Sequence, residues 1–299
     1  MTTPAVRTVN RGGSRYYIHP VTKEKAIGVT SVVGMLPKDF LKWWAAKMVA
    51  EEAVNNFGAL ASLVAGDGAD AAVDWLKRAH LRNTGEASIR GTDIHELTET
   101  IDLEGGIPKG TPKAHLGYAR GYLAFREETE AEIVEVETTV WNSSYGYSGT
   151  LDRTLRIPES AFSTLDAPPS WYEGSEKPII ADVKTTRSGV HAEVALQMSA
   201  YKHAEEKMVH QDDGGFHPEP WAPLQDTGLV IWLRPDEWQL VPVDISYPLF
   251  DIFLSLMQVL TWEKELKSEV LYPPLTGQKW EEPDIIQLEK ILKSLGGKK

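Results

Sequence analysis

The spacing of apolar residues changes near residue 130, and this change constrains the fold more than any other feature of the chain. Before it, apolar residues recur every three or four positions, most clearly between Pro37 and Phe57, which is the period of an amphipathic helix. From Glu132 to Val140 apolar and polar residues alternate instead, as they do in a strand with one buried face. The chain therefore predicts helices first and a sheet-containing core after them.

The helical and strand spacings of apolar residues, together with residues typical of turns, predict where the other helices, strands and loops lie. A short hairpin is expected between Arg15 and Thr30, with Thr30 or Ser31 capping the helix that follows. The segment from Pro178 to Lys184 is mostly apolar and predicts a central strand. Further helices are expected over 69–81, 88–103, 191–208, 247–266 and 284–299, further strands over 145–157 (antiparallel to the first), 228–234 and 238–245, and Pro/Gly-rich loops over 158–177 and 211–226.

Together these elements predict an α/β fold, in which a central mixed sheet of about five strands is flanked by helices. We expect a single domain over residues 1–299. It would consist of a mainly helical region at 1–88, a core at 89–245 and C-terminal helices at 246–299. The N-terminal helices are expected to form a wall over a cleft in the core.

Composition excludes several classes of site. The chain has no cysteine, so it carries no disulfide, no zinc–thiolate site and no iron-sulfur cluster. No segment approaches the roughly 18 apolar residues of a membrane span, and the first residues lack the apolar run of a signal peptide, so we expect a cytoplasmic protein without a membrane partner. The net charge of -12 argues against a protein that coats nucleic acid, but it is compatible with an acidic site for a divalent cation.

Three residues form the core of a candidate catalytic site. Asp152 lies in the second strand of the predicted hairpin, while Asp182 and Lys184 lie two residues apart on one face of the central strand. Two carboxylates on neighbouring strands provide the hard oxygen ligands that Mg²⁺ and Mn²⁺ prefer. A lysine beside them would orient or deprotonate an attacking water, or stabilise the charge of a phosphorane.

Four motifs surround these residues in a fixed order. They are Gly91-Thr92-Asp93-Ile94-His95, Gly149-Thr150-Leu151-Asp152, Ala181-Asp182-Val183-Lys184-Thr185-Thr186 and Gln197-Met198-Ser199-Ala200-Tyr201. Over roughly residues 85–245 their order and separations resemble the PD-(D/E)XK nuclease superfamily, in particular its RecB-like branch, which includes CRISPR-associated and phage exonucleases. The chain lacks both the cysteines of the cluster-containing members and a Gly-x-x-x-x-Gly-Lys-Ser/Thr motif, so it resembles a stand-alone phage-type exonuclease more than the cluster-containing or helicase-linked members.

The resemblance implies a metal site and a catalytic lysine. His95, Asp152, Asp182 and the backbone carbonyl of Val183 would hold Mg²⁺ or Mn²⁺, and Lys184 would be the catalytic lysine.

The resemblance also implies supporting residues. Gln197 and Tyr201 are one helical turn apart and would position the lysine, the water or the DNA strand. Glu137 matches a glutamate that helps to hold metal or water, although Glu135 lies on the same face of its strand.

The implied function is metal-dependent hydrolysis of DNA phosphodiester bonds by an exonuclease of phage replication or recombination. Its partners would be the ends of linear or single-stranded DNA, and a homo-oligomer or a recombination partner protein is compatible with this class. Three alternatives are open: a catalytically silent member that only binds DNA or protein, an endonuclease of the same fold, and a metal hydrolase of a small phosphorylated substrate. The silent member predicts a broken metal set and the small-substrate enzyme a phosphate-binding loop; the sequence shows neither.

Each candidate residue also has a purely structural interpretation. His95 would be a packed or surface helix residue, Asp182 and Lys184 a solvated strand end, and Gln197 and Tyr201 a helix face in solvent. Asp152 followed by Arg153 would be a surface ion pair of little stability. Trp43 is a candidate for base stacking whereas helical spacing assigns Trp44 to the core, and the basic residues that would touch phosphates or remain solvated are Arg90, Arg153, Arg187 and Lys202.

Overall fold

The computed structural model describes residues 6–270, 277 and 289–290, and the chain divides into two units, residues 1–260 and 261–299. In the second unit, Trp262–Leu266 forms a short π-helical segment. Of the helix predicted over 284–299, only residues 289–290 are among those described, and they are helical. Within the described part, no helix is both long and apolar enough to cross a bilayer.

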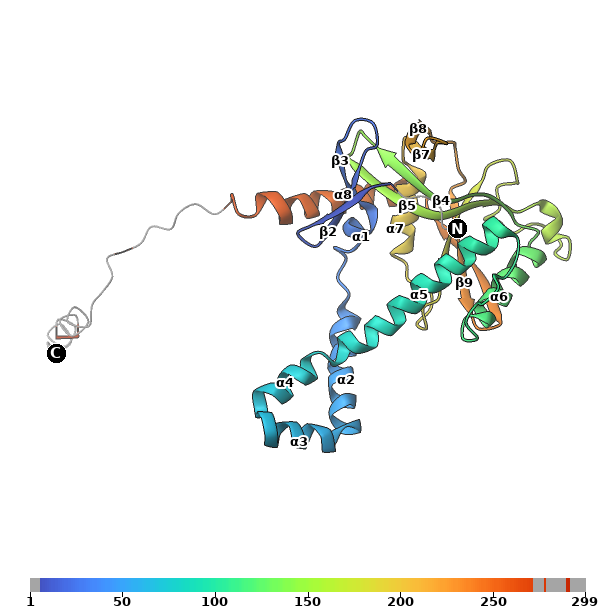
Figure 1. Cartoon of the computed structure of the whole chain (residues 1–299). Coiled ribbons are helices and arrows are strands. Elements are labelled where there is room, and N and C mark those ends of the chain that lie inside the picture. Colours follow the sequence, from blue (N-terminus) through green and yellow to red (C-terminus); the bar gives the residue numbers. More distant parts are fainter. Residues whose placement is uncertain (1–5, 271–276, 278–288, 291–299) are drawn as a thin grey trace, which may run out of the picture. The chain divides into compact units, whose positions relative to one another are not determined.

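The first unit is built on a mixed sheet, which has ten strands in the described part of the chain. Neighbouring strands follow the order β1-β2-β3-β5-β4-β7-β8, and β6 branches from β5 to continue through β9 to β10 (Figure 1). Only β3 with β5 and β6 with β9 pair in parallel among the described pairs. The strands are β1 (Thr8–Arg11), β2 (Ser14–Ile18), β3 (Lys25–Gly28), β4 (Glu132–Asn142), β5 (Tyr147–Arg156), β6 (Ile179–Lys184), β7 (Glu206–His210), β8 (Phe216–Pro220), β9 (Thr227–Arg234) and β10 (Glu237–Asp244).

The α/β class, the mixed sheet, the two predicted hairpins and the central strand β6 are confirmed, but the expectation of about five strands is wrong. The N-terminal hairpin joins the sheet through the pairing of β3 with β5. The helix predicted over 191–208 ends at Lys202, and β7 and β8 follow it as an antiparallel pair inside segments predicted as helix and loop. Pairing of Met208 with Thr139 of β4 is a long-range contact that local spacing does not report.

The helices are α1 (Val29–Val33), α2 (Asp39–Asn55), α3 (Phe57–Asp67), α4 (Ala69–Lys77), α5 (Ala79–Glu104), α6 (Leu116–Glu128), α7 (Val194–Lys202) and α8 (Tyr247–Thr261), with a 3₁₀ turn at Glu159–Phe162. Helices α1, α7 and α8 cover one face of the sheet, and α5 and α6 cover the other. Helices α2, α3 and α4 pack against one another, and α2 and α4 also pack against α5. The segments predicted at 69–81 and 88–103 are in fact α4 and one long helix, α5. The predicted cap is also wrong: α1 starts after Gly28 without a side-chain cap, and the Ser31 hydroxyl instead accepts a hydrogen bond from the Arg15 N–H at 2.9 Å.

Two hydrophobic clusters lie on opposite faces of the central strands. One contains Ile180 of β6 together with residues of α1, α7 and α8, and the other contains Ile179, Ala181 and Val183 together with residues of α5 and α6. Because successive side chains of a strand point to opposite faces, an apolar β6 is buried on both sides. This packing holds α5 against one face of β6 and α7 against the other.

Candidate active site

The site begins at a fork between two strands. β5 and β6 pair from Leu155↔Ile179 to Arg153↔Ala181, and beyond this point Asp182, Val183 and Lys184 pair with β9 on the other side of β6. Asp152 lies at the opening of the fork, where its Oδ2 accepts a hydrogen bond from the Val183 N–H at 2.8 Å. The Asp152 carboxylate thus accepts a hydrogen bond from a backbone N–H, that of Val183, which lies beyond the paired part of β5 and β6.

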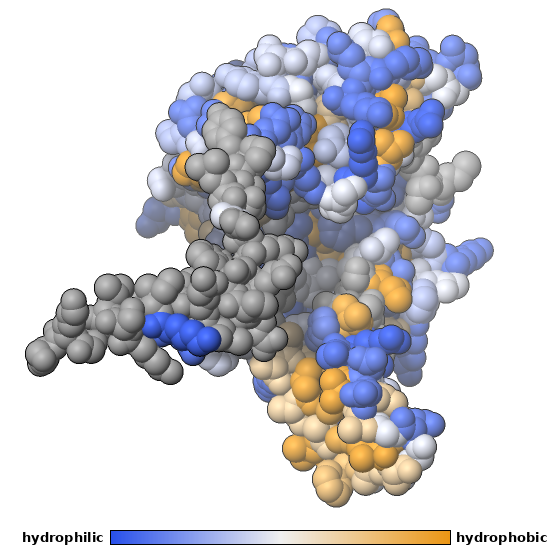
Figure 2. Space-filling model, turned by 90° about the vertical axis from the view of Figure 1, so that its left-hand side faces the viewer, coloured by the Kyte–Doolittle hydropathy of each residue, from blue (hydrophilic) through white to orange (hydrophobic). Residues whose placement is uncertain are grey.

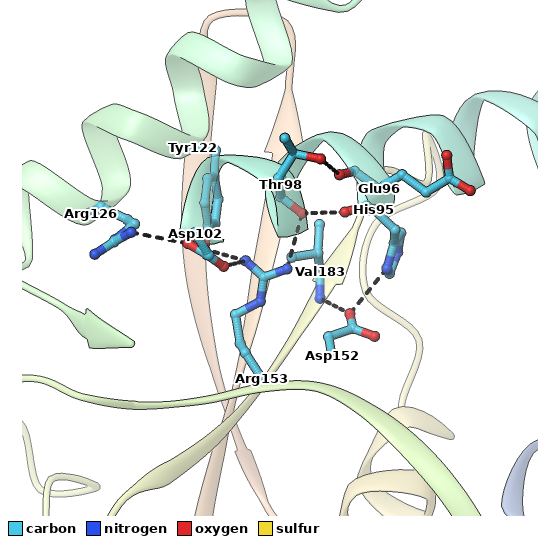
Figure 3. Close-up of polar contacts among 10 residues, drawn as sticks. His95, Glu96, Thr98, Asp102, Tyr122, Arg126, Asp152, Arg153 and Val183 are labelled. Atoms are coloured by element: carbon cyan, nitrogen blue, oxygen red, sulfur yellow. Dashed lines mark hydrogen bonds and ion pairs between the residues drawn. The ribbon is translucent and has the colours of Figure 1, made fainter. Parts of the chain in front are cut away.

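The helix α5 brings an imidazole to the same carboxylate. His95 Nδ1 lies 3.2 Å from Asp152 Oδ2 (Figure 3). The Asp152 carboxylate raises the pKa of His95 above its usual value, against the lowering effect of burial. Burial alone would raise the pKa of Asp152, but the charges of His95, Lys184 and Arg153 lower it well below its usual range. Asp152 is therefore ionised, as a metal ligand must be.

Asp182 and Lys184 form the second part of the site. Lys184 Nζ lies 2.5 Å from Asp182 Oδ2, and Gln197 Nε2 of α7 donates a hydrogen bond to Asp182 Oδ1 at 3.3 Å. Burial would lower the pKa of Lys184, but Asp182 and Asp152 raise it above its usual value. Lys184 thus carries a positive charge here, and this favours an electrostatic or orienting role over deprotonation of water.

Glu137 joins the cluster through an irregularity of β4. It falls between the pairs Val136↔Arg153 and Thr138↔Leu151, opposite Asp152, and its φ of +48° is in the left-handed region. Burial, Asp152 and Glu99 raise the pKa of Glu137 to about 7. A carboxyl with such a pKa holds or releases a proton near neutral pH.

Glu135, the alternative on the same strand, lies elsewhere: its carboxylate makes an ion pair with Lys207 of β7. Glu99, which the motifs did not single out, is buried on α5 one turn after His95 and acts on Glu137. Its spacing of four residues from His95 is the signal that points to it.

Tyr201 is buried in the site instead of facing solvent. Burial raises the pKa of Tyr201 well above its usual value, so its hydroxyl stays protonated. The ring lies against Gly149 of β5: a Cβ at that position would come within 2.5 Å of Tyr201 Cε1. The glycine that opens the Gly-x-x-Asp motif therefore makes room for the tyrosine of the Gln-x-x-x-Tyr motif.

Arg153 corrects the expectation of a surface ion pair or a phosphate contact. Its guanidinium is fully buried between α5 and α6, where it donates to Asp102 Oδ2 at 2.8 Å and to Thr98 Oγ1 at 3.0 Å (Figure 3). Tyr122 and Arg126 of α6 donate to the same Asp102 carboxylate, at 2.7 and 3.1 Å. This buried network fixes the part of α5 that carries His95.

The remaining candidates lie as follows. Lys202 makes an ion pair with Asp226, and Arg187 is exposed. Trp44 is half-buried, whereas Trp43 is exposed.

The donor set fits a hard divalent cation. Asp152 is ionised, and the buried Asp182 Oδ2 lies 2.5 Å from the ammonium of Lys184. Burial raises the pKa of Asp182, and the charge of Lys184 opposes this shift. Within the described residues, no three His, Asp or Glu side chains lie together as a metal-binding group. His95 pairs with Asp152, and Lys184 pairs with Asp182. Binding of a cation would compete with these two ion pairs.

Comparisons with known proteins leave the chain without an assigned family. No family model matches it, and no curated protein matches it. Among the solved structures, a protein described as SSO0001 is 13% identical, with a TM-score of 0.26, over 62% of this chain and 85% of that one. A likeness of this size carries no argument about fold or function.

Proposed function

We propose that the protein is an Mg²⁺- or Mn²⁺-dependent deoxyribonuclease with a PD-(D/E)XK core of the RecB-like type. The observation that carries the proposal is the meeting of four side chains at the fork of β5 and β6: Asp152, Asp182, Lys184 and His95. They come from two strands and a helix. Along the chain, the motifs that contain these residues follow the same order as the motifs of the RecB-like nucleases that they resemble. The set is complete, which speaks against a silent binding protein.

In this proposal, Asp152, Asp182, the neutral imidazole of His95 and the carbonyl of Val183 would hold the cation, and His95 would release the proton that its pairing with Asp152 favours. When bound, the cation would supply Lewis-acid activation of a phosphodiester and a lowered pKa of water. Lys184 places a fixed positive charge beside the phosphoryl group.

The other polar side chains act on the nucleophile and on the strand. Glu137, with its pKa near 7, accepts a proton from the attacking water at a carboxylate oxygen. Gln197 holds Asp182 in place, and the Tyr201 hydroxyl remains a hydrogen-bond donor.

The proposed reaction is exonucleolytic, on the ends of linear or single-stranded DNA, in phage replication or recombination within the host cytoplasm. This assignment rests on the likeness of the motifs to phage-type exonucleases. An endonuclease would use the same side chains, because preference for an end depends on the shape of the binding surface and not on the catalytic groups.

The test incubates purified protein with end-labelled linear DNA and with closed-circular DNA, in Mg²⁺, Mn²⁺ or EDTA. We expect cleavage of linear DNA that EDTA abolishes, and a loss of about a hundredfold or more in Lys184→Met. Lys202→Met is the matched control, because Lys202 also pairs with an aspartate but lies outside the site. Activity that survives EDTA or Asp182→Ala contradicts the mechanism, cleavage of circular DNA identifies an endonuclease, and DNA binding without cleavage identifies the silent alternative.

A further inference from the structure

The helix α3 is apolar but has no buried residue. Its eleven residues, Phe57–Asp67, read FGALASLVAGD, and among them only Asp67 is charged. A helix that is apolar all round belongs in the interior of a protein or an assembly. The lack of burial therefore indicates a missing neighbour.

The chain covers only one side of α3. The helix contacts α2 and α4, and Leu60 and Leu63 are half-buried. Phe57, Ala61 and Val64 are exposed, and their spacing of four and three residues places them in one stripe along the helix. In Figure 2, apolar residues gather on the lower lobe, where α3 and α4 lie in Figure 1.

The exposed apolar area, summed over α2 to α5, comes close to the lower end of what a dimer needs. Two exposed aromatic side chains of this helical region, Trp43 and Phe57, are 80% and 71% exposed and offer roughly 300 Å². Four aliphatic side chains with exposed fractions near one half or more add roughly 200 Å²; they are Val54, Val64, Val73 and Leu81. The total of roughly 500 Å² approaches the ~600 Å² per partner at the lower end of specific interfaces.

The charges also favour a second copy of the chain. No charged residue occurs from Ala53 to Gly66, so two copies with a net charge of -12 each could meet along this part of α3 without placing like charges together. Antiparallel pairing would bring Asp67, which ends α3, beside the first turn of the partner's α3. That turn carries the positive end of the helix dipole.

We infer that α3 is a homodimer surface, on which two copies pair antiparallel about Ala61. In this register Phe57 lies beside the partner's Ala65, and Val64 lies beside the partner's Gly58, so large side chains meet small ones. A Cβ at Gly58 of the single chain meets no atom within 4 Å, which leaves room for the partner's valine. The surface goes beyond the proposed nuclease site, because none of its residues belongs to that site.

The first experiment measures the mass of the full-length protein by sedimentation velocity over a range of concentrations. We expect a dimer for the wild type and a dissociation constant raised about tenfold or more in Val64→Glu, since a carboxylate would be buried opposite an apolar helix. Val21→Glu is the matched control, because Val21 is 59% exposed in the turn between β2 and β3. A wild type that is monomeric up to about 100 µM, or a dimer that Val64→Glu leaves intact, overturns the inference.

The second experiment uses the absence of cysteine. A single Ala61→Cys on the two-fold axis would face its own copy, and helices that cross at small residues come close enough for a disulfide. We expect oxidation to yield a covalent dimer of Ala61→Cys and not of Val21→Cys. Absence of the crosslink overturns the register, and flotation of the wild type with phosphatidylcholine vesicles in place of dimerisation identifies a membrane surface and overturns the inference.

Discussion

Two consecutive residues of β5 have different environments and different tasks. Asp152 faces the fork and interacts with Val183, His95 and the charge of Lys184, while Arg153 is 1% exposed and holds α5 to α6 through Asp102. A buried ion pair adds little stability compared with an apolar pair, but loss of one partner leaves an uncompensated charge. The hydrogen bonds and ion pairs of Arg153 therefore hold α5, the helix that carries His95, in place.

Removal of the Asp102 charge should destabilise the fold strongly. We expect Asp102→Asn to lower the free energy of unfolding by about 3–5 kcal/mol, because Arg153 would remain buried without its carboxylate. Urea unfolding measures this change, and Asp236→Asn is the control. Asp236 also lies 2.7 Å from an arginine, Arg120, but both side chains are exposed, so the control should lose less than about 1 kcal/mol. Equal losses in the two variants would contradict this account.

At the scale of the elements, the two glycines of the motifs, Gly149 and Gly91, differ in how closely neighbouring residues pack against them. A Cβ at Gly149 would meet the Tyr201 ring at 2.5 Å and Val29 at 3.2 Å. A Cβ at Gly91, inside α5, would meet only Thr185 Oγ1 at 3.9 Å, an ordinary contact. One glycine is required by packing within the chain and the other is not.

Alanine at the two positions should therefore have opposite effects on stability. We expect Gly149→Ala to cost about 1–3 kcal/mol through overpacking, and Gly91→Ala to add about 0.5–1 kcal/mol, since glycine is a poor helix former. Thermal unfolding measures both. If Gly91→Ala is more stable and yet loses nuclease activity, the substrate backbone occupies the space beside Gly91; if it is less stable, the packing described here is wrong.

The residue that follows α7, His203, is a partly buried histidine that should respond to pH. The His203 ring stacks on Phe250 at 4.6 Å, and its Nδ1 lies 2.9 Å from the Ser199 carbonyl oxygen. Burial lowers the pKa of His203; Lys202 lowers it further, while the Ser199 carbonyl, Asp226 and Asp251 oppose the shift. Because the folded pKa is below the unfolded value, the stabilisation is present above pH ~6.5 and is lost as the pH falls through the folded pKa.

We expect the Tm of the metal-free wild type to fall between pH 7 and pH 5 by more than the Tm of His203→Gln. The difference between the two proteins isolates this histidine from the other groups that titrate in the window. His217→Gln at an exposed position is the control and should follow the wild type. A wild type and a His203→Gln variant with parallel Tm profiles would show that the ring is not desolvated in solution.

The sequence predicts some elements well and others poorly, for physical reasons. The strand β6 begins with three apolar residues and is buried on both faces, and α8 has a strong apolar period, so the local pattern suffices for both. The strand β7 has no such pattern, because its stability comes from pairing with β4 and β8. At the site, motif spacing predicts which residues meet, whereas the burial of Arg153 and the left-handed φ of Glu137 depend on α6 and on the register of β4.

At the scale of the whole molecule, the net charge of -12 would limit how the proposed nuclease binds DNA. An acidic surface releases few counterions from DNA and attracts it little, so we expect weak DNA binding without a divalent cation. Within the acidic site, His95 pairs with Asp152 and Lys184 pairs with Asp182. Cation binding and DNA binding should therefore be coupled, because the cation offsets the charge of both.

Divalent metal should also stabilise the fold, and this can be measured without any substrate. A ligand that binds only the folded state adds RT ln(1 + [L]/Kd), or about 2.7 kcal/mol at a hundredfold excess over Kd. We expect Mn²⁺ to raise the Tm of the wild type and of Asp226→Asn, whose carboxylate lies outside the site, but not of Asp182→Asn. Since Asp182→Asn also removes a buried charge, its Tm without metal is the reference, and only the shift on addition of Mn²⁺ counts. An equal shift in all three proteins would place the cation elsewhere and remove the central support for the proposed chemistry, even if the α/β fold stands.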